Sequence, residues 1–285
     1  MKKVLSVCLA LLLAGAAQAH IVGNLREKVS RKIVSQEEGT MFLQAINEHN
    51  LSVVNAMLQQ SRKPTLLVNY KDGDGNNSLM ISVEKGYFDF LPLLEKNKVD
   101  VNAPNNDNWT ALCSAANNKD LRMVGYLVGS MKADVNYECG TGRHRTSPLL
   151  LASEGHSNTL IVDILVKAHA NVNYRDPEGY TPLMELAYGG NVVAMDILVK
   201  AGADINAEVP SYKGRGMPVA FCPIWTGELP ALKYLMEQGA ELHGYFVDGG
   251  YAAPLDIATN GGPEMVEYVK SLGFTDHNFH DPTWD

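Results

Sequence analysis

Apolar residues recur at helical spacing along much of this chain. The stretch 121–128 is typical, because Leu121, Val124, Leu127 and Val128 fall on one side of a helix. Turn-forming segments such as Asp72-Gly73-Asp74-Gly75 interrupt the apolar stretches. The pattern predicts short amphipathic helices joined by polar turns.

The same pattern returns at a fixed interval. Residues 163–173 and 196–206 share the run Asp-Ile-Leu-Val-Lys-Ala and begin 33 residues apart. A second mark, Thr181-Pro182-Leu183, is echoed at 147–149, 110–112 and 77–79, each time followed by small residues that let two helices pack closely. A period of this length indicates a repeat architecture.

These marks resemble the ankyrin repeat, whose unit of ~33 residues is a β-turn and two helices. The resemblance covers residues 40–274 and implies an all-α fold, an ankyrin-repeat solenoid of about seven stacked helix-turn-helix units with β-turn fingers. The first and last units fit least well, as expected of terminal caps that bury one face only. With the Leu of Thr-Pro-Leu as the anchor of each unit, the anchors are Phe42, Leu79, Leu112, Leu149, Leu183, Val219 and Leu255.

Proline positions test this register. Pro230 and Pro263 fall where the register begins a helix, and the first turn of a helix tolerates proline. Pro92 would lie inside a helix, where proline costs ~3 kcal/mol. We therefore expect that helix to start late, with Asp89 as its cap.

The two ends of the chain differ from the repeats. Residues 1–19 combine Lys2 and Lys3, an apolar run and Ala17-Gln18-Ala19, which is typical of a cleaved signal peptide, so the mature chain is expected to begin at His20 and to be periplasmic. The apolar run is too short to span a membrane. Residues 20–39 are expected to form an N-terminal capping helix, and residues 275–285 a polar tail.

The net charge argues against one class of partner, and the number of cysteines limits how they can pair. Loss of Lys2 and Lys3 leaves 22 of the 24 basic residues against 32 acidic ones, a net charge of −10, which argues against a nucleic-acid partner. Cys113, Cys139 and Cys222 remain in the mature chain. An odd number leaves at least one thiol without a partner in the chain, and the pairing of the others stays open.

The resemblance implies that partners bind the concave face, which the fingers and the exposed side of each first helix line together. Large aromatic side chains recur there, at positions that the repeat does not need for packing. Aromatic residues dominate the binding energy of many interfaces, although any one of them could instead fill a gap between fingers. The aromatic candidates for partner binding are Trp109, Tyr180, Tyr188, Trp225 and Tyr251.

Two fingers are longer than the pattern requires, and both carry basic residues. Asn136 to Leu149 and Asn206 to Val219 each span 13 positions, whereas Asn173 to Leu183 spans 10. Basic tips on an acidic protein could hold a carboxylate of a partner, or they could simply be solvated loop ends. The further partner-binding candidates are Arg143, His144, Arg145, Tyr212, Lys213 and Arg215.

Residues suited to catalysis or metal binding do not form a convincing set. The segment 72–83 begins like a calcium loop but has Asn77 at the sixth position and Val83 at the twelfth, where such loops need Gly and Glu. His277 and His280 in the tail could hold a metal weakly. We expect no catalytic residues, no metal and no cofactor.

These observations favour a bacterial periplasmic binding protein that docks one protein partner on its concave face. A sharper hypothesis is an immunity-type factor that neutralises a toxic or hydrolytic enzyme. The alternatives are a secreted effector that binds a host protein, and a metal-binding or enzymatic protein that uses the His-rich tail and Cys139. The free chain is expected to be a monomer that binds neither nucleic acid nor membrane.

Overall fold

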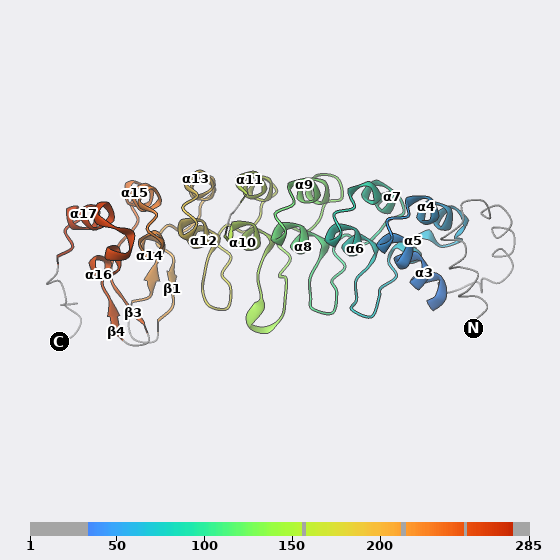
Figure 1. The fold of residues 1–285 in the computed structure, drawn as a ribbon, viewed down its shortest axis with the longest axis horizontal. Coiled ribbons are helices and arrows are strands. Elements are labelled where there is room, and N and C mark those ends of the chain that lie inside the picture. The colour runs from blue at the N-terminus through green and yellow to red at the C-terminus, as the bar shows by residue number, and fades with distance from the viewer. Residues whose placement is uncertain (1–33, 156–157, 212–214, 248–249, 276–285) are drawn as a thin grey trace.

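The helices of this chain stack in two parallel rows, in one elongated array (Figure 1). This arrangement is seen in a computed structural model that describes residues 34–155, 158–211, 215–247 and 250–275. Among the described residues no helix is long and apolar enough to cross a membrane. The expected signal peptide, residues 20–33 of the expected capping helix, Tyr212, Lys213 and the His-containing tail lie outside the described residues.

Each anchor residue lies in the first helix of a pair, or in the 3-10 turn that leads into it. The first helices are α3 (Gln36–Asn47), α6 (Ser78–Glu84), α8 (Ala111–Asn117), α10 (Pro148–Ser153), α12 (Pro182–Tyr188), α14 (Cys222–Thr226, after the 3-10 turn η4, Val219–Phe221) and α16 (Pro254–Ala258). The second helices are α4 (Leu51–Gln60), α7 (Leu91–Lys96), α9 (Leu121–Gly129), α11 (Thr159–Lys167), α13 (Val192–Lys200), α15 (Leu229–Glu237) and α17 (Pro263–Ser271). The repeat register therefore predicted the order of the helices.

A helix begins at each Thr-Pro-Leu segment or its equivalent, and the anchor Leu of that segment is buried. Asn77, Thr110, Ser147 and Thr181 each accept a hydrogen bond from the backbone N–H three residues on, which caps the helix. The Leu that follows two residues later is at most 1% exposed in all four units. Because the cap and the anchor lie in one short segment, the start of each first helix is readable from the sequence.

A ladder of asparagines joins consecutive units at the base of the fingers. Asn102, Asn136 and Asn173 each accept a hydrogen bond from a backbone N–H of the next unit, at 2.9, 2.7 and 2.7 Å. Asn206 does the same with Glu241 at 2.8 Å. The ladder gives these backbone groups a partner and fixes the spacing between units.

Turn residues of the fingers likewise bond to their own backbone. The Asp72 carboxylate accepts from the backbone N–H groups of Asp74 and Asn76, and Gly75 has a φ of +83°. Asp176 accepts from the backbone N–H of Tyr180 at 2.7 Å, in a turn where Gly179 has a positive φ. The Asp-x-x-Gly mark is therefore a turn signature.

The proline positions agree with the register, with one correction. Pro230 lies in the first turn of α15, and α17 begins at Pro263. The helix that holds Pro92 does start late, at Leu91, but Asp89 does not cap it. Asp89 lies in a preceding 3-10 turn, Phe88–Phe90, and its carboxylate bonds to His49 at 2.9 Å, so a contact with the previous unit uses the side chain that would have capped α7.

The long fingers contain short antiparallel pairings that an all-α prediction omits. Cys139 pairs with Thr146 across the first long finger. In the second, β1 (Glu208–Val209) pairs with β2 (Met217–Pro218), and a third hairpin joins β3 (Tyr245–Val247) to β4 (Gly250–Ala252) between the last two units. The first unit adds α5 (Pro64–Val68), which starts at Pro64, where the usual unit ending is missing.

Candidate functional site

The fingers project from the side of the array that carries the first helices (Figure 1). We call this surface, formed by the fingers and the exposed side of the first helices, the finger face. It is the surface on which the resemblance predicts partner binding. The residues predicted from the sequence and found in the described part of the chain divide between an aromatic strip, a disulfide-bonded finger and two basic loops.

The aromatic strip consists of Tyr180, Tyr188, Trp225 and Tyr245. The rings of Tyr180 and Tyr188 lie 6.2 Å apart between centroids. Trp225 is 41% exposed and donates its indole N–H to the Tyr245 hydroxyl at 2.9 Å. Three of the four residues were predicted from the sequence. Trp225 and the partly exposed Tyr180 present rigid rings to solvent, which suits them to contact with a partner.

Tyr188 is the most enclosed of the predicted aromatic residues in the strip. Its hydroxyl donates to the Met217 sulfur at 3.5 Å and interacts with Tyr180 and the buried Cys222. Burial, reinforced by these neighbours, raises the pKa of Tyr188 far above the usual value of a phenol. Tyr188 therefore contributes a partly buried ring to the strip, whereas Trp225 presents its ring to solvent.

Tyr245 was not predicted, although it completes the strip. Its ring packs edge-on against Phe221, with centroids 4.7 Å apart. Tyr251, which was predicted, lies on the paired strand and is only partly exposed. The unit before this hairpin lacks the Asn that forms the ladder at the base of the other fingers, so the sequence carried no signal for the hairpin.

Trp109 lies outside the strip. It packs against a small buried cluster of Cys113, Ala116, Cys139 and Leu151. Its predicted role in partner binding is untested, and its contacts within the chain show that it also closes the base of a long finger.

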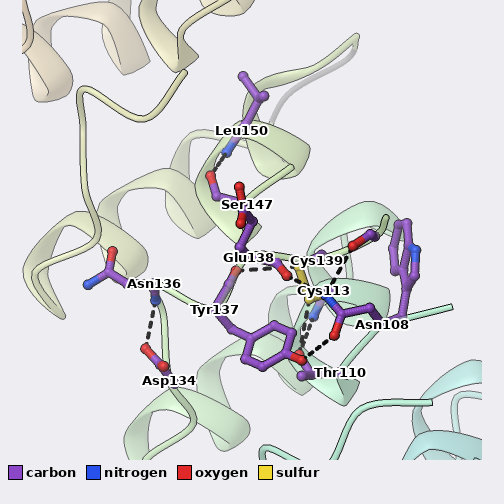
Figure 2. Close-up of a disulfide and its surroundings, with 12 residues drawn as sticks. Asn108, Thr110, Cys113, Asp134, Asn136, Tyr137, Glu138, Cys139, Ser147 and Leu150 are labelled. Carbon is purple, nitrogen blue, oxygen red and sulfur yellow. Dashed lines mark hydrogen bonds between the residues drawn. A yellow bond between two sulfur atoms is a disulfide. The ribbon is translucent and has the colours of Figure 1, made fainter. Parts of the chain in front are cut away.

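A disulfide joins Cys113 on α8 to Cys139 in the first long finger (Figure 2). Both cysteines are fully buried, and the free Cys222 lies in the core of a later unit. Asn108 adds further ties, because its side-chain amide donates to the carbonyls of Glu138 and Gly140 and its side-chain oxygen accepts from the Tyr137 hydroxyl. The finger is thus held to the preceding unit by one covalent bond and several hydrogen bonds.

Basic residues at the tips of the long fingers are exposed, but two of them already have acidic partners. Arg145 lies 3.4 Å from Glu138, and Arg215 lies 3.1 Å from Glu241. Arg143 and His144 lie in an exposed 3-10 turn, Gly142–His144. The ion pairs reduce the net positive charge that these loops offer to a partner.

A cluster of charged side chains was not predicted from the sequence. Lys119 follows α8 and donates to the Leu151 carbonyl, while Glu154 ends α10, Glu185 lies in α12 and Asp176 lies in the finger before α12. Glu154 and Glu185 act electrostatically on Lys119, and Glu154 and Asp176 act on Glu185. Burial, then repulsion from Glu154 and Asp176, raises the pKa of Glu185 to about 7. Burial also lowers the pKa of Lys119. Single charged residues dispersed along a repeat give no recognisable motif, so only their placement side by side shows the cluster.

Metal ligands do not gather anywhere in the described residues, which contain no group of three or more His, Cys, Asp or Glu side chains placed to hold an ion. The residues that began like a calcium loop use Asp72 for the turn itself, because its carboxylate already accepts two backbone N–H groups. His277 and His280 lie outside the described residues. The finger face thus offers aromatic and charged contacts.

Two spider toxins share part of this sequence. Alpha-latroinsectotoxin-Lt1a from Latrodectus tredecimguttatus is 35% identical over 101 residues, which make up 35% of this chain and 7% of the toxin. Alpha-latrocrustotoxin-Lt1a from the same organism is 29% identical over 119 residues, 41% of this chain and 8% of the toxin. The chain spans less than a tenth of either toxin, so the similarity extends over a run of repeats only.

A family description matches more of the chain. The description "Ankyrin repeats (3 copies)" matches residues 42–139 and again residues 134–209, which together are more than half of the chain. The matched segments contain the anchors from Phe42 to Leu183, the Asn ladder and the Asp-x-x-Gly turns. Ankyrin repeats are protein-interaction modules, and this chain belongs to the ankyrin-repeat family.

Proposed function

We propose that this protein binds one protein partner through the finger face, with the aromatic strip at the centre of the contact. The observation that carries the proposal is the strip itself, in which the 41% exposed Trp225 is bonded to the buried Tyr245 and the rings of Tyr180 and Tyr188 are partly buried. Exposed aromatic rings backed by a packed layer are typical of residues that contribute most to binding. The rigid stack loses little conformational entropy when it binds, which favours tight association.

The proposed place of action is the bacterial periplasm. Residues 1–19 have the features of a cleaved signal peptide. The disulfide between Cys113 and Cys139 supports export independently, because disulfides persist in oxidising compartments. Two unrelated features of the chain thus favour the same compartment.

The proposed role is inhibition of an enzyme that acts in that compartment. The long fingers extend beyond the common length of the repeat, and they belong to the units before and after the one that carries Tyr180 and Tyr188. One of them is held in place by the disulfide, so it could enter a cleft without losing its shape. An immunity-type or protective factor would need such a rigid, occluding surface.

Affinity capture from periplasm with the mature chain, followed by mass spectrometry, identifies the partner. The activity of that partner is then measured with and without saturating mature chain. Loss of activity in the complex supports inhibition. Full activity at saturation excludes inhibition and leaves a scaffold role.

Substitution of the strip tests where the partner binds. Trp225→Ala and Tyr180→Ala should each weaken binding of the captured partner by ~1 to 4 kcal/mol, because hot-spot aromatics contribute energies of this size. Tyr234→Ala is the matched control, since Tyr234 lies on the second helix α15 of the same unit as Trp225. Equal binding by wild type and both strip variants, measured by calorimetry, would contradict the proposed surface.

A further inference from the structure

His243 occupies the repeat position at which the preceding units carry a ladder asparagine. The segment Glu241-Leu242-His243 aligns with Asp204-Ile205-Asn206, which closes the unit before it. In the described part of the chain α17 is the last helix, so the ladder is not continued from His243 to a further unit. A histidine here departs from the rule of the repeat, and such a departure indicates a role outside repeat packing.

His243 joins the hairpins of the last two fingers. The hairpins β1–β2 and β3–β4 lie side by side at the C-terminal end of the finger face, with β2 against β3 (Figure 1). The Nε2 atom of His243 lies 3.0 Å from one carboxylate oxygen of Glu208 on β1. The other oxygen accepts from the backbone N–H of Gly216 at 2.9 Å. The Glu208 carboxylate therefore closes its own hairpin and holds the next one.

Both nitrogens of the His243 ring face oxygen atoms that accept hydrogen bonds. Nδ1 lies 2.9 Å from the Gly244 carbonyl oxygen, and Nε2 lies against the Glu208 carboxylate. A neutral imidazole has a proton on one ring nitrogen only, so one of the two contacts would bring a lone pair against an oxygen atom. The imidazolium ion donates to both oxygens. The geometry therefore favours the protonated ring, in an ion pair whose side chains are 13% and 34% exposed.

The backbone beside His243 leads directly into the aromatic strip. Gly244 precedes Tyr245, whose hydroxyl accepts from the Trp225 indole N–H at 2.9 Å. A Cβ at Gly244 would overlap the Tyr251 ring, so that ring encloses the segment on one side. The bond from His243 to the Gly244 carbonyl orients the peptide group that joins Gly244 to Tyr245. The placement of the exposed Trp225 ring is therefore linked to this contact.

The first hairpin carries a contact to the other half of the strip. Met217 in β2 accepts from the Tyr188 hydroxyl at 3.5 Å. Because Glu208 bonds to both hairpins, loss of its bond to His243 removes a tie between the two halves of the strip.

Arginines next to the first hairpin already have acidic partners. Arg215 pairs with Glu241 at 3.1 Å. Arg175 lies 3.9 Å from the Asp204 carboxylate and donates to a backbone carbonyl of β1 at 2.8 Å. Asp248, between β3 and β4, lies outside the described residues. These pairs occupy the arginines that would otherwise compete for the carboxylate between the hairpins.

We propose that His243 and Glu208 are positioning residues of the binding site, and that protonation of His243 makes the partner bind more tightly in a mildly acidic medium. This inference rests on the proposed function and adds its regulation. When the ring is protonated, both of its bonds form and the last two fingers hold the strip in one arrangement. As the pH rises through the range in which histidine side chains lose their charge, about 5 to 8, the ion pair is lost and the strip becomes less ordered.

An NMR titration of the mature chain tests the contact without a partner. The indole N–H signal of Trp225 is identified by its absence from Trp225→Phe, and the ring signals of His243 by their absence from His243→Gln. The Trp225 signal should shift with pH at the same midpoint as the His243 ring. The shift should be largely lost in His243→Gln and in Glu208→Gln. A Trp225 signal that does not follow the His243 ring, or that shifts equally in both variants, overturns the proposal.

Calorimetry with the captured partner at pH 5.5 and at pH 8 tests the consequence for binding. From the lower to the higher pH, wild type should lose about fivefold more affinity than His243→Gln, the lower end of coupling between linked sites. Both proteins keep Glu185, so its titration and that of the partner cancel in this comparison. His169→Asn is the matched control, because it removes an exposed histidine that follows α11, and it should keep the pH dependence of wild type. Circular dichroism with a urea midpoint verifies that every variant folds.

The regulation and the proposed function fail in different ways. If the captured partner is insensitive to Trp225→Ala and Tyr180→Ala, the binding surface is wrong whatever the NMR titration shows. If those variants weaken binding while wild type and His243→Gln respond equally to pH, the surface stands and its regulation by His243 falls.

Discussion

Single polar side chains determine where each unit starts and how it joins the next. A Ser, Thr or Asn caps a first helix, and an Asn at the base of a finger bonds to the backbone of the following unit. Both roles need one residue type at one place, so they are visible as short marks in the sequence. Glu185 is the opposite case, because its raised pKa comes from burial in the stack and then from Glu154 and Asp176 in other segments.

The stability of the chain should respond to pH through Glu185. Its pKa lies at about 7 in the folded chain, against 4.5 for a free carboxyl group, so the folded state favours the protonated form. Between pH 4.5 and 7 the unfolded chain ionises at this position while the folded chain keeps the proton, so this contribution to stability is lost over that range. Glu185→Gln removes this loss, and we expect the variant to exceed wild type by about 1–2 kcal/mol at pH 8, allowing for solvent screening.

Urea unfolding of both proteins at pH 4.5 and at pH 8 measures the effect. The two should have similar midpoints at the lower pH and separate at the higher one. Glu264→Gln is the control, because Glu264 is exposed on α17 and should show no such separation. A constant difference between Glu185→Gln and wild type at both pH values would refute an ionisation effect.

Fingers are the elements in which this chain departs most from a plain repeat. The first long finger has a single bridge between Cys139 and Thr146, and the hairpins β1–β2 and β3–β4 follow in later units. An isolated pairing of this size is marginal in water. The disulfide to α8 and the bonds to Asn108 supply the missing stability for the first of them (Figure 2).

Loss of the disulfide should loosen that finger and lower overall stability. We expect Cys113→Ser/Cys139→Ser to lower the free energy of unfolding by about 2–4 kcal/mol, because the bond joins residues 26 positions apart and so closes a long loop. Amide exchange should rise most in residues 137–146. Hydrogen exchange with mass spectrometry measures the local effect, and urea unfolding measures the global one.

A thiol assay checks the pairing itself. The expected removal of residues 1–19 leaves three cysteines, so the unfolded, unreduced protein should then show one reactive thiol, that of Cys222. Cys222→Ala is the control and should show none. Three reactive thiols in material from the periplasm would contradict the disulfide, as would unchanged exchange in the Cys113→Ser/Cys139→Ser finger.

The whole molecule is a linear array in which each unit contacts its neighbours (Figure 1). Such an array needs end units that differ from the middle, and α5 in the first unit is one such difference. Tyr180 and Tyr188 belong to one unit and Trp225 to the next, so two neighbouring units form the aromatic strip together. The proposed binding surface therefore depends on the stacking of units.

The expected signal peptide predicts the residue at which the mature chain begins. We expect cleavage between Ala19 and His20, because the small residues at positions 17 and 19 fit the site of signal peptidase. Intact-mass measurement of protein isolated from the periplasm gives the result directly. Ala17→Lys/Ala19→Lys should block processing, since peptidase requires small side chains there. A mass that retains residues 1–19 in the wild type would reject the prediction.

The sequence by itself determined the repeat, the helix order and most of the turn chemistry. Caps, anchors and Asp-x-x-Gly turns act within a few residues of one another, so periodicity alone reveals them. Asp89 shows the limit of this reasoning. Its side chain was expected to cap α7, but it bonds instead to His49 in the previous unit.

Only the tertiary structure decided which side chains from different units meet. It paired Cys113 with Cys139, set Arg145 and Arg215 against acidic partners, and placed the Tyr245 hydroxyl against Trp225. It also placed Glu154, Asp176 and Lys119 near enough to the half-buried Glu185 to influence its pKa. These residues come from different segments of the chain, and their interactions depend on distances of a few ångströms that arise when the units stack.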